Sequence, residues 1–156
     1  PIERAYGCNH MWCVFCNTPW NWATGKRDRA GMGNPHVVIP VDAVDEIDLD
    51  RFGSRFEVHP AFPAKTNVHF VEVLAPDHLQ MVVWERGAGI TLACGTGACA
   101  TLVNAVRRGL ADRKATLVLD GGELVIEWRE SDNHVRMTGP VAISFRGEID
   151  PSLVTA

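Results

Sequence analysis

Residues 98–109 limit how this chain can fold more than any other stretch, because they predict a helix with almost no polar face. They read ACATLVNAVRRG and stay apolar nearly all round until Arg107. A helix of this kind must be covered on most of its sides. Arg107 and Arg108 suit the negative end of the helix dipole, and Gly109 suits the position after the last turn. The rest of the chain must therefore supply a large apolar surface around this helix.

Seven short runs with β-forming patterns are expected to supply that surface. They lie at residues 36–41, 67–74, 79–85, 115–119, 123–128, 135–138 and 141–146. The sequence DGG at 120–122 predicts a hairpin, and Asp48 and Pro60 are expected to begin and stop a second helix. We therefore expect an α+β fold in which a curved, mostly antiparallel sheet wraps around one central helix, with the second helix outside.

Composition narrows the range of functions. The chain has 156 residues, a net charge of −4 and no long apolar run, which suits one globular domain and disfavours nucleic acid or a membrane as partner. The cysteines number five, at positions 8, 13, 16, 94 and 99. Because no secretory signal is seen, we expect reduced thiols and a cytoplasmic location.

The first 30 residues differ from the rest. They hold three of the cysteines and three of the five tryptophans, and they show no period of 2 or 3.6. We expect residues 1–30 to be an unrelated or poorly ordered segment, and residues 31–156 to form the folded domain.

Residues 7–20, GCNHMWCVFCNTPW, resemble the iron–sulfur loop of radical S-adenosylmethionine enzymes of the deazaguanine-synthase type. That family has three residues between its first two cysteines, whereas this chain has four. Two metal hypotheses stay open: a cluster on Cys8, Cys13 and Cys16, or a zinc site that adds His10. The interpretation we favour is a remnant of a gene junction that binds no metal.

Cys94 stands just ahead of the apolar helix, in the sequence CGTG. A helix N-terminus carries unpaired N–H groups and partial positive charge, and glycines let a ligand approach the backbone. A carboxylate could dock on the N–H groups of residues 95–97, and the same field is expected to lower the pKa of the Cys94 thiol. The alternative is a small buried cysteine followed by a tight turn. Cys99, further into the helix, is expected to lie in the core.

Glu85 and Arg86 end a predicted strand just upstream of Cys94. Arg86 can hold a carboxylate with two hydrogen bonds, and Glu85 can pair with an ammonium group. Together with the thiol and the anion site, these residues suit a zwitterionic amino acid as ligand. The alternative is an ordinary surface ion pair, which would contribute little.

Several stretches, in matching order and spacing over about 120 residues, resemble the C-terminal half of diaminopimelate epimerase, here about residues 31–150. They are VWERGAG at 83–89, TLACGTGACA at 91–100, MGNPH at 32–36, FPAKTNV at 62–68, GGEL at 121–124 and MTGP at 137–140. The resemblance implies one half of that family's fold and a cofactor-independent, metal-free interconversion of LL- and meso-diaminopimelate by two thiols.

Carried over by motif, the resemblance gives each residue a role. Cys94 would be one of the two proton-transfer thiols, with its acidity tuned by His36 and Glu85. The substrate α-carboxylate would bind the backbone N–H groups of Gly95 and Thr96. The other polar groups of the substrate would be held by Asn34, Asn67, Glu85 and Arg86.

The chain also departs from the family. Position 90 is Ile where the resemblance leads us to expect an acidic residue, and residues 1–30 contain no counterpart of the family's other glycine-flanked cysteine. The second thiol would then come from a homodimer partner or from a separate N-terminal half. There are two competing hypotheses. One is a catalytically incomplete fragment that keeps the fold, with or without weak ligand binding. The other is a metal-binding module built on the N-terminal cysteines.

Overall fold

The structure is a computed structural model that describes residues 12–15, 18–20, 32 and 34–153. Its helices are η2 (Val44–Glu46), α1 (Leu49–Glu57), α2 (Gly95–Arg107) and η3 (Pro151–Leu153). Its strands are β1 (Trp12–Phe15), β2 (Thr18–Trp20), β3 (His36–Pro40), β4 (Asn67–Ala75), β5 (His78–Glu85), β6 (Gly89–Thr91), β7 (Lys114–Leu119), β8 (Gly122–Trp128) and β9 (Val135–Thr138). In this described part of the chain, no helix is long and apolar enough to cross a membrane.

All the described strands join one sheet, in the order β2-β1-β3-β4-β5-β7-β8-β9, with β6 paired to β5. The pairs β3–β4 and β5–β7 are parallel, and the other six described pairings are antiparallel. The hairpin predicted at 120–122 joins β7 to β8, with Gly122 at a φ of +126°. The α+β fold with a mostly antiparallel sheet is confirmed.

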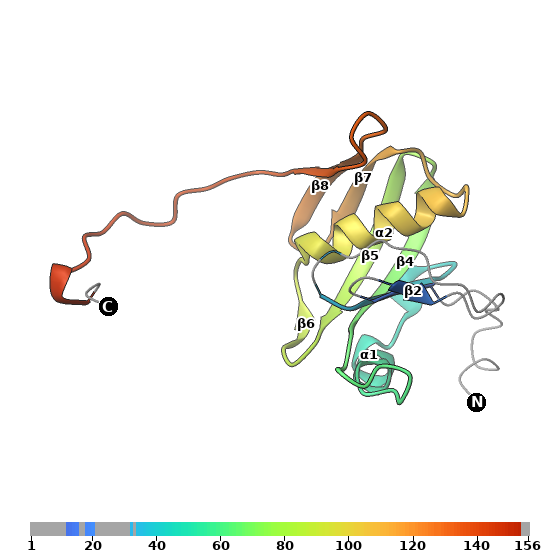
Figure 1. Ribbon diagram of the computed structural model, residues 1–156. Coiled ribbons are helices and arrows are strands. Elements are labelled where there is room, and N and C mark those ends of the chain that lie inside the picture. The colour runs from blue at the N-terminus through green and yellow to red at the C-terminus, as the bar shows by residue number, and fades with distance from the viewer. Residues whose placement is uncertain (1–11, 16–17, 21–31, 33, 154–156) are drawn as a thin grey trace.

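The sheet carries a hydrophobic core on each face, because side chains alternate along its central strands. On β4, Val68 and Phe70 belong to the core that also holds Phe56 of α1. Val71 belongs to the opposite core, with Leu102 of α2. Figure 1 shows α2 lying across one face of the curved sheet, and Phe56 places α1 against the core on the other face. One helix is central and the second is outside, as the sequence predicts.

Helix α2 is enclosed as its composition requires. Eight of its 13 residues are buried, among them Ala98, Leu102 and Ala105, and Gly109 follows it with a φ of +70°. Helix α1 begins as expected, because the Asp48 side chain accepts a hydrogen bond from the Arg51 backbone N–H at 3.0 Å.

The strand predicted at residues 141–146 is wrong. Residues 139–150 contain no helix or strand, and they run away from the sheet beyond β9 (Figure 1). A run with period-2 apolar side chains becomes a strand only where a neighbour pairs with its backbone. No described strand lies beside this segment, and Val141 and Phe145 are 94% and 86% exposed. Strands β1, β2 and β6 were not predicted.

Candidate functional site

Cys94 is the N-cap of α2, in extended backbone conformation, and its side chain is only 6% exposed. Of the two residues that follow it, Gly95 is half-buried and Thr96 is exposed. No backbone carbonyl in the described part of the chain accepts a hydrogen bond from the N–H groups of Gly95 or Thr96. The first turn of α2 therefore keeps backbone donors for an anion, directly above a buried thiol.

The expected lowering of the Cys94 pKa is wrong. Burial raises the pKa of this thiol above its ordinary value, and the negative charge of Glu85 raises it further. A hydrogen bond between Cys94 Sγ and Thr96 Oγ1, at 3.6 Å, acts in the opposite direction but does not reverse the shift. The sulfur packs against core side chains, and the loss of hydration disfavours a thiolate there. In this structure, Cys94 is a thiol at neutral pH.

A hydrogen-bonded chain runs beneath α2 from Asn34 through His36 to His69. The His36 Nε2–H donates to Asn34 Oδ1 at 2.9 Å, and His36 Nδ1 lies 2.8 Å from His69 Nε2. Burial, followed by the charge of Arg86, lowers the pKa of His36 to about 4, so this ring is neutral at neutral pH. A neutral ring that donates from Nε2 must accept at Nδ1, so His69 Nε2–H is the donor of the second bond.

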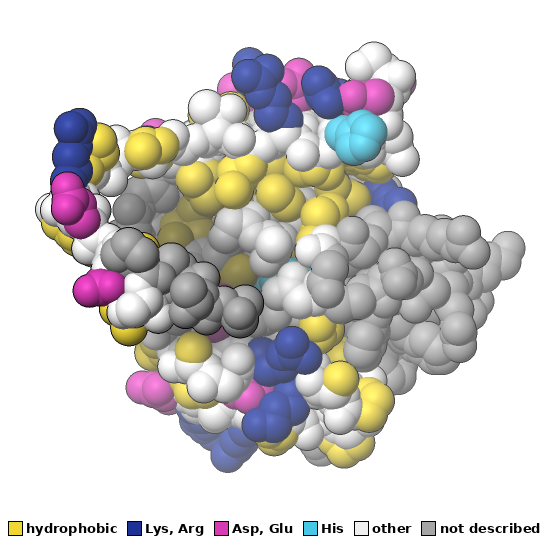
Figure 2. Space-filling model, turned by 60° about the vertical axis from the view of Figure 1, so that its left-hand side comes forward, with side chains coloured by type: hydrophobic (Ala, Val, Ile, Leu, Met, Phe, Trp, Pro, Cys, Tyr) yellow, Lys and Arg dark blue, Asp and Glu magenta, His cyan; other side chains and the backbone are white. Residues whose placement is uncertain are grey.

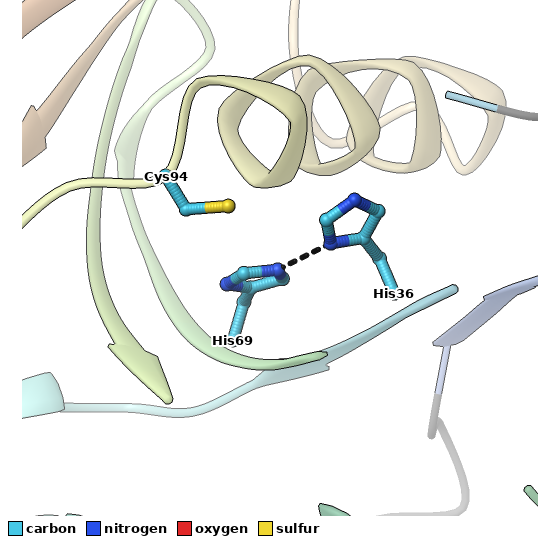
Figure 3. Close-up of side chains that lie close together, drawn as sticks. All are labelled: His36, His69 and Cys94. Atoms are coloured by element: carbon cyan, nitrogen blue, oxygen red, sulfur yellow. Dashed lines mark hydrogen bonds between the residues drawn. The ribbon is translucent and has the colours of Figure 1, made fainter. Parts of the chain in front are cut away.

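His69 was missed by the sequence analysis, although it lies beside the predicted site. It is fully buried, and Figure 3 shows its ring between His36 and Cys94. Its position in the strand predicted at residues 67–74 could have indicated this. Side chains alternate along a strand, so His69 lies on the same face as Val71, which is the face toward α2. His36, predicted as a site residue, lies next to it because β3 and β4 pair in parallel with Val38 opposite His69.

Gly97 has a different role from the one predicted for it. A Cβ at this position would lie 2.4 Å from Cε1 of His69, so the glycine makes room for a buried ring. The prediction was that the CGTG glycines let a ligand approach the backbone. At Gly95 that interpretation stays a prediction, and a Cβ there would meet only the flexible end of Met137, at 3.0 Å.

The remaining predicted residues surround the loop between β5 and α2. Glu85 Oε1 accepts a hydrogen bond from Thr91 Oγ1 at 2.7 Å, and Arg86 Nη1 donates to the Ala64 carbonyl at 2.9 Å. Asn67 binds protein at both ends of its amide, since Nδ2 donates to the Pro35 carbonyl and Oδ1 accepts from the Arg86 backbone N–H. Asn67 thus fixes the turn that presents Arg86.

The surface near the site combines apolar and charged side chains. Figure 2 shows a hollow on one face, with hydrophobic side chains around it and lysine or arginine side chains on two sides. The exposed apolar residues include Ile90 of β6, 48% exposed, and Met137 of β9, 51% exposed, whose side chain lies beside Gly95 of α2. Ile90, where the resemblance led us to expect an acidic residue, lies on β6 opposite Trp84 of β5.

The proposed N-terminal metal ligands cannot be placed. Cys8, His10 and Cys16 lie outside the described residues, and of Cys13 the structure describes only the backbone in β1. The resemblance of residues 7–20 to an iron–sulfur loop, and the boundary at residue 30, stay predictions.

Two solved structures share the fold of this chain. A phenazine biosynthesis protein of the PhzF family from Bacillus anthracis superimposes with a TM-score of 0.51 at 19% identity, covering 82% of this chain and 40% of that one. A PhzC/PhzF protein from Clostridium difficile superimposes with a TM-score of 0.50 at 16% identity, covering 78% of this chain and 41% of that one. The chain therefore has a fold seen in about two fifths of each of these proteins.

Sequence comparison identifies the family of the chain. The model of the diaminopimelate epimerase family matches residues 29–144. A diaminopimelate epimerase from Heliobacterium modesticaldum is 63% identical over 118 residues, which cover 76% of this chain and 42% of the relative. A diaminopimelate epimerase from Picosynechococcus is 57% identical over 149 residues, which cover 96% of this chain and 47% of the relative. The chain belongs to the diaminopimelate epimerase family, and it spans less than half the length of these relatives.

Proposed function

We propose that this chain supplies one of the two proton-transfer thiols of a diaminopimelate epimerase, and that this thiol is Cys94. The observation that carries the proposal is the position of the sulfur at the N-terminus of α2, beneath the open backbone donors of Gly95 and Thr96. A carboxylate on those donors would bring the α-carbon of an amino acid close to the sulfur. Family membership supports an amino acid as the substrate.

The reaction needs one proton removed and one delivered on opposite sides of the α-carbon. In one direction, the Cys94 thiolate takes the α-proton, the C–H electron pair stays on carbon as a carbanion, and a second thiol delivers its proton to the far face. In the other direction, the Cys94 thiol delivers the proton. Because Cys94 is a thiol in this structure, it is ready for the delivering role.

The α-proton of an amino acid is a very weak acid, so the carbanion must be stabilised. Preorganised donors on the carboxylate, in a site closed to water, can supply several kcal/mol of that stabilisation. The Gly95 and Thr96 N–H groups would serve the carboxylate. Glu85 would face the ammonium group, and Arg86, Asn34 and Asn67 would hold the remaining polar groups, as the family resemblance implies.

The second thiol would come from another polypeptide half, either a second copy of this chain or a separate N-terminal half. Among the residues whose side chains the structure describes, Cys94 and Cys99 are the free cysteines, and Cys99 lies further along the same helix. The segment 139–150 supports a partner, because it exposes apolar side chains at Val141, Ile143 and Phe145 on alternate positions. Such a row is typical of a strand that pairs with another element.

The test is exchange of the substrate α-proton with solvent. The chain is incubated with diaminopimelate in D₂O, and deuterium at the α-carbon is measured by NMR. Replacing Cys94 with Ala should lower the exchange rate by about 10²–10⁴-fold, as for loss of a positioned acid or base. Cys99→Ala is the matched control and should keep the parental rate. Exchange that is unchanged in Cys94→Ala would contradict the role of Cys94.

Sedimentation of the same samples tests the partner. A homodimer that exchanges deuterium supports two Cys94 thiols in one assembly. A monomer that gains exchange only when an N-terminal half is added supports the separate half. A strict monomer that exchanges no deuterium under either condition contradicts the proposal.

A further inference from the structure

His36, His69 and Cys94 form a cluster that the proposed reaction only partly uses. They come from β3, β4 and the N-terminus of α2, and one ligand atom from each lies within 4.8 Å of the others. All three side chains are buried, and Figure 3 shows the sulfur and both rings facing the same small space. Two imidazoles and a thiolate are donors that Zn²⁺ prefers.

The spacing suits a single ion after a small adjustment. Zinc bonds of about 2.0–2.3 Å in a tetrahedral site place the donor atoms about 3.4–3.6 Å apart. Because His69 Nε2–H donates to His36, the free lone pair of His69 is on Nδ1. One nitrogen of each ring and the sulfur lie within 4.8 Å of one another, so the widest pair would close by about 1.2–1.4 Å at most.

The protonation states of the rings favour a cation. His36 Nδ1 presents a lone pair toward His69, because its Nε2–H is committed to Asn34. His69 Nδ1 is buried and has no hydrogen-bond partner among the described residues, so its lone pair is unsatisfied, whereas that of His36 Nδ1 accepts from His69 Nε2–H. A buried acceptor of this kind is costly unless something binds it. This orphan nitrogen is the observation, independent of the spacing, that points to a ligand.

We propose that His36, His69 and Cys94 bind one zinc-class divalent cation, with one coordination position left for water or a small ligand. On binding, Cys94 releases its thiol proton to solvent and bonds the ion as a thiolate. The ion takes the Nδ1 lone pair of each ring, so the hydrogen bond from His69 Nε2–H to His36 Nδ1 is exchanged for a bond from His36 to the ion, and both rings stay neutral. The thiolate and the nearby Glu85 carboxylate offset the two positive charges of the ion, whereas the positive charge of Arg86 opposes its binding.

Occupancy of this site would inhibit the enzyme. A metal-bound thiolate has its lone pair committed and cannot take or return an α-proton. This consequence rests on the proposed function of Cys94, whereas the binding of the ion does not. The two are therefore tested by separate measurements.

The experiment is a titration with Co²⁺, a spectroscopic substitute for Zn²⁺, on the full chain with Cys8, Cys13 and Cys16 replaced by Ser. This background removes the other candidate ligands, and the protein is kept reduced. We expect one equivalent of Co²⁺ to bind with a thiolate-to-cobalt charge-transfer band and the intense visible bands of a four-coordinate ion. Zn²⁺ should displace the cobalt, and it should protect Cys94, more than Cys99, from alkylation detected by mass spectrometry.

Variants locate the site. Cys94→Ser and His69→Gln should each weaken binding by more than about 100-fold, the upper end of the losses seen for outer-shell changes, and Cys94→Ser should remove the charge-transfer band. Cys99→Ser and His78→Gln are matched controls that should keep both the cobalt affinity and the charge-transfer band. Circular dichroism checks the fold of each variant. Cobalt that binds equally well to Cys94→Ser, or that binds without a thiolate band, or no binding at millimolar metal, overturns the proposal.

Zinc inhibition of deuterium exchange is measured afterwards. If cobalt binds at Cys94 but the metal-free chain exchanges no deuterium, the metal site stands and the proposed function fails. If deuterium exchange occurs but no metal binds, the proposed function stands and the metal site fails.

Discussion

Gly97 and His69 fit together across the gap between α2 and the sheet. The imidazole of His69 lies where the side chain of any other residue at position 97 would begin, with Cε1 2.4 Å and Nε2 2.6 Å from an ideal Cβ. The ring is fully buried in β4 and the glycine is in the first turn of α2. The distance between the helix N-terminus and the sheet therefore depends on the absence of one methyl group.

We expect Gly97→Ala to destabilise the protein, although alanine is the better helix former. The clash with a buried ring should cost about 1–3 kcal/mol, which exceeds the gain of about 0.5–1 kcal/mol from helix propensity. The free energy of unfolding, measured in urea, checks the sign. Gly147→Ala is the control, because nothing lies within 4 Å of its Cβ position, and it should change stability by less than about 0.5 kcal/mol.

A second variant tests whether the clash is with His69. In the background of His69→Ala, the change Gly97→Ala meets no ring and should cost less than it does alone. An equal cost in both backgrounds would show that the two residues are not coupled.

The fold followed from sequence wherever a pattern had one interpretation. The apolar stretch before Arg107 could only be an enclosed helix, and DGG at 120–122 could only be a tight turn between strands. The segment 141–146 has an equally good strand pattern, but a strand also needs a neighbour, and sequence periodicity does not say whether one is present. That is why this prediction was wrong.

The candidate site was predicted less completely than the fold. Cys94, Glu85 and Arg86 were proposed from sequence because their residue types suggested chemistry near a helix start. His69 lay within an apolar strand, where a single histidine is usually part of the core, and its contact with His36 depends on the parallel register of β3 and β4. The pKa of Cys94 could not be predicted because it depends on burial, which opposes the field of the helix.

Glu57 is expected to stabilise the protein through its hydrogen bonds. Its carboxylate accepts from Trp84 Nε1 at 2.7 Å and from the Gly87 backbone N–H at 3.1 Å, so it joins α1 to β5 and the following turn. Glu57→Gln replaces one acceptor oxygen with a donor and should cost about 1–3 kcal/mol at pH 7. Urea unfolding measures this cost, and Glu46→Gln, at an exposed position of η2, is the control.

The same residue predicts a dependence on acid. The hydrogen bond from Trp84, more than any other contact, holds the pKa of Glu57 below its ordinary value of 4.5. A carboxyl group with a lower pKa in the folded state stabilises the fold above its unfolded pKa and loses that contribution as pH falls through the folded pKa. The parental protein should therefore lose more stability than Glu57→Gln below about pH 4.5. Parallel curves for the two proteins would contradict this.

His36 predicts a second dependence, at higher pH. Its pKa is about 4 in the folded protein, chiefly because of burial, against 6.5 in the unfolded chain. As pH falls below 6.5 the unfolded chain takes up the proton first, so the free energy of unfolding should fall by up to about 3 kcal/mol between pH 6.5 and 4. In metal-free protein, NMR of the His36 ring should show no titration above pH 5.5. His36→Gln should reduce the loss of stability, and a ring that titrates near 6.5 would refute the burial argument.

Thr96 is expected to control how readily Cys94 ionises. Its hydroxyl lies 3.6 Å from the sulfur and favours the thiolate, against burial and the charge of Glu85. Thr96→Val keeps the shape of the side chain and removes the hydroxyl, which should raise the pKa of Cys94 further. Loss of a hydrogen bond worth about 0.5–1.5 kcal/mol should slow alkylation of Cys94 at a fixed pH by roughly 2–10-fold.

Mass spectrometry can follow both thiols of metal-free Thr96→Val in one sample, so Cys99 serves as an internal control. The pKa of Cys99 is also raised, chiefly by burial and then by the charge of Cys94, but Thr96 is not among the causes, so the alkylation rate of Cys99 should change far less than that of Cys94. Equal slowing at both cysteines would mean that the substitution changed the opening of α2 rather than the acidity of Cys94. Thr96→Ser keeps the hydroxyl and should restore the parental rate at Cys94, since only the hydrogen bond distinguishes the two replacements in this prediction.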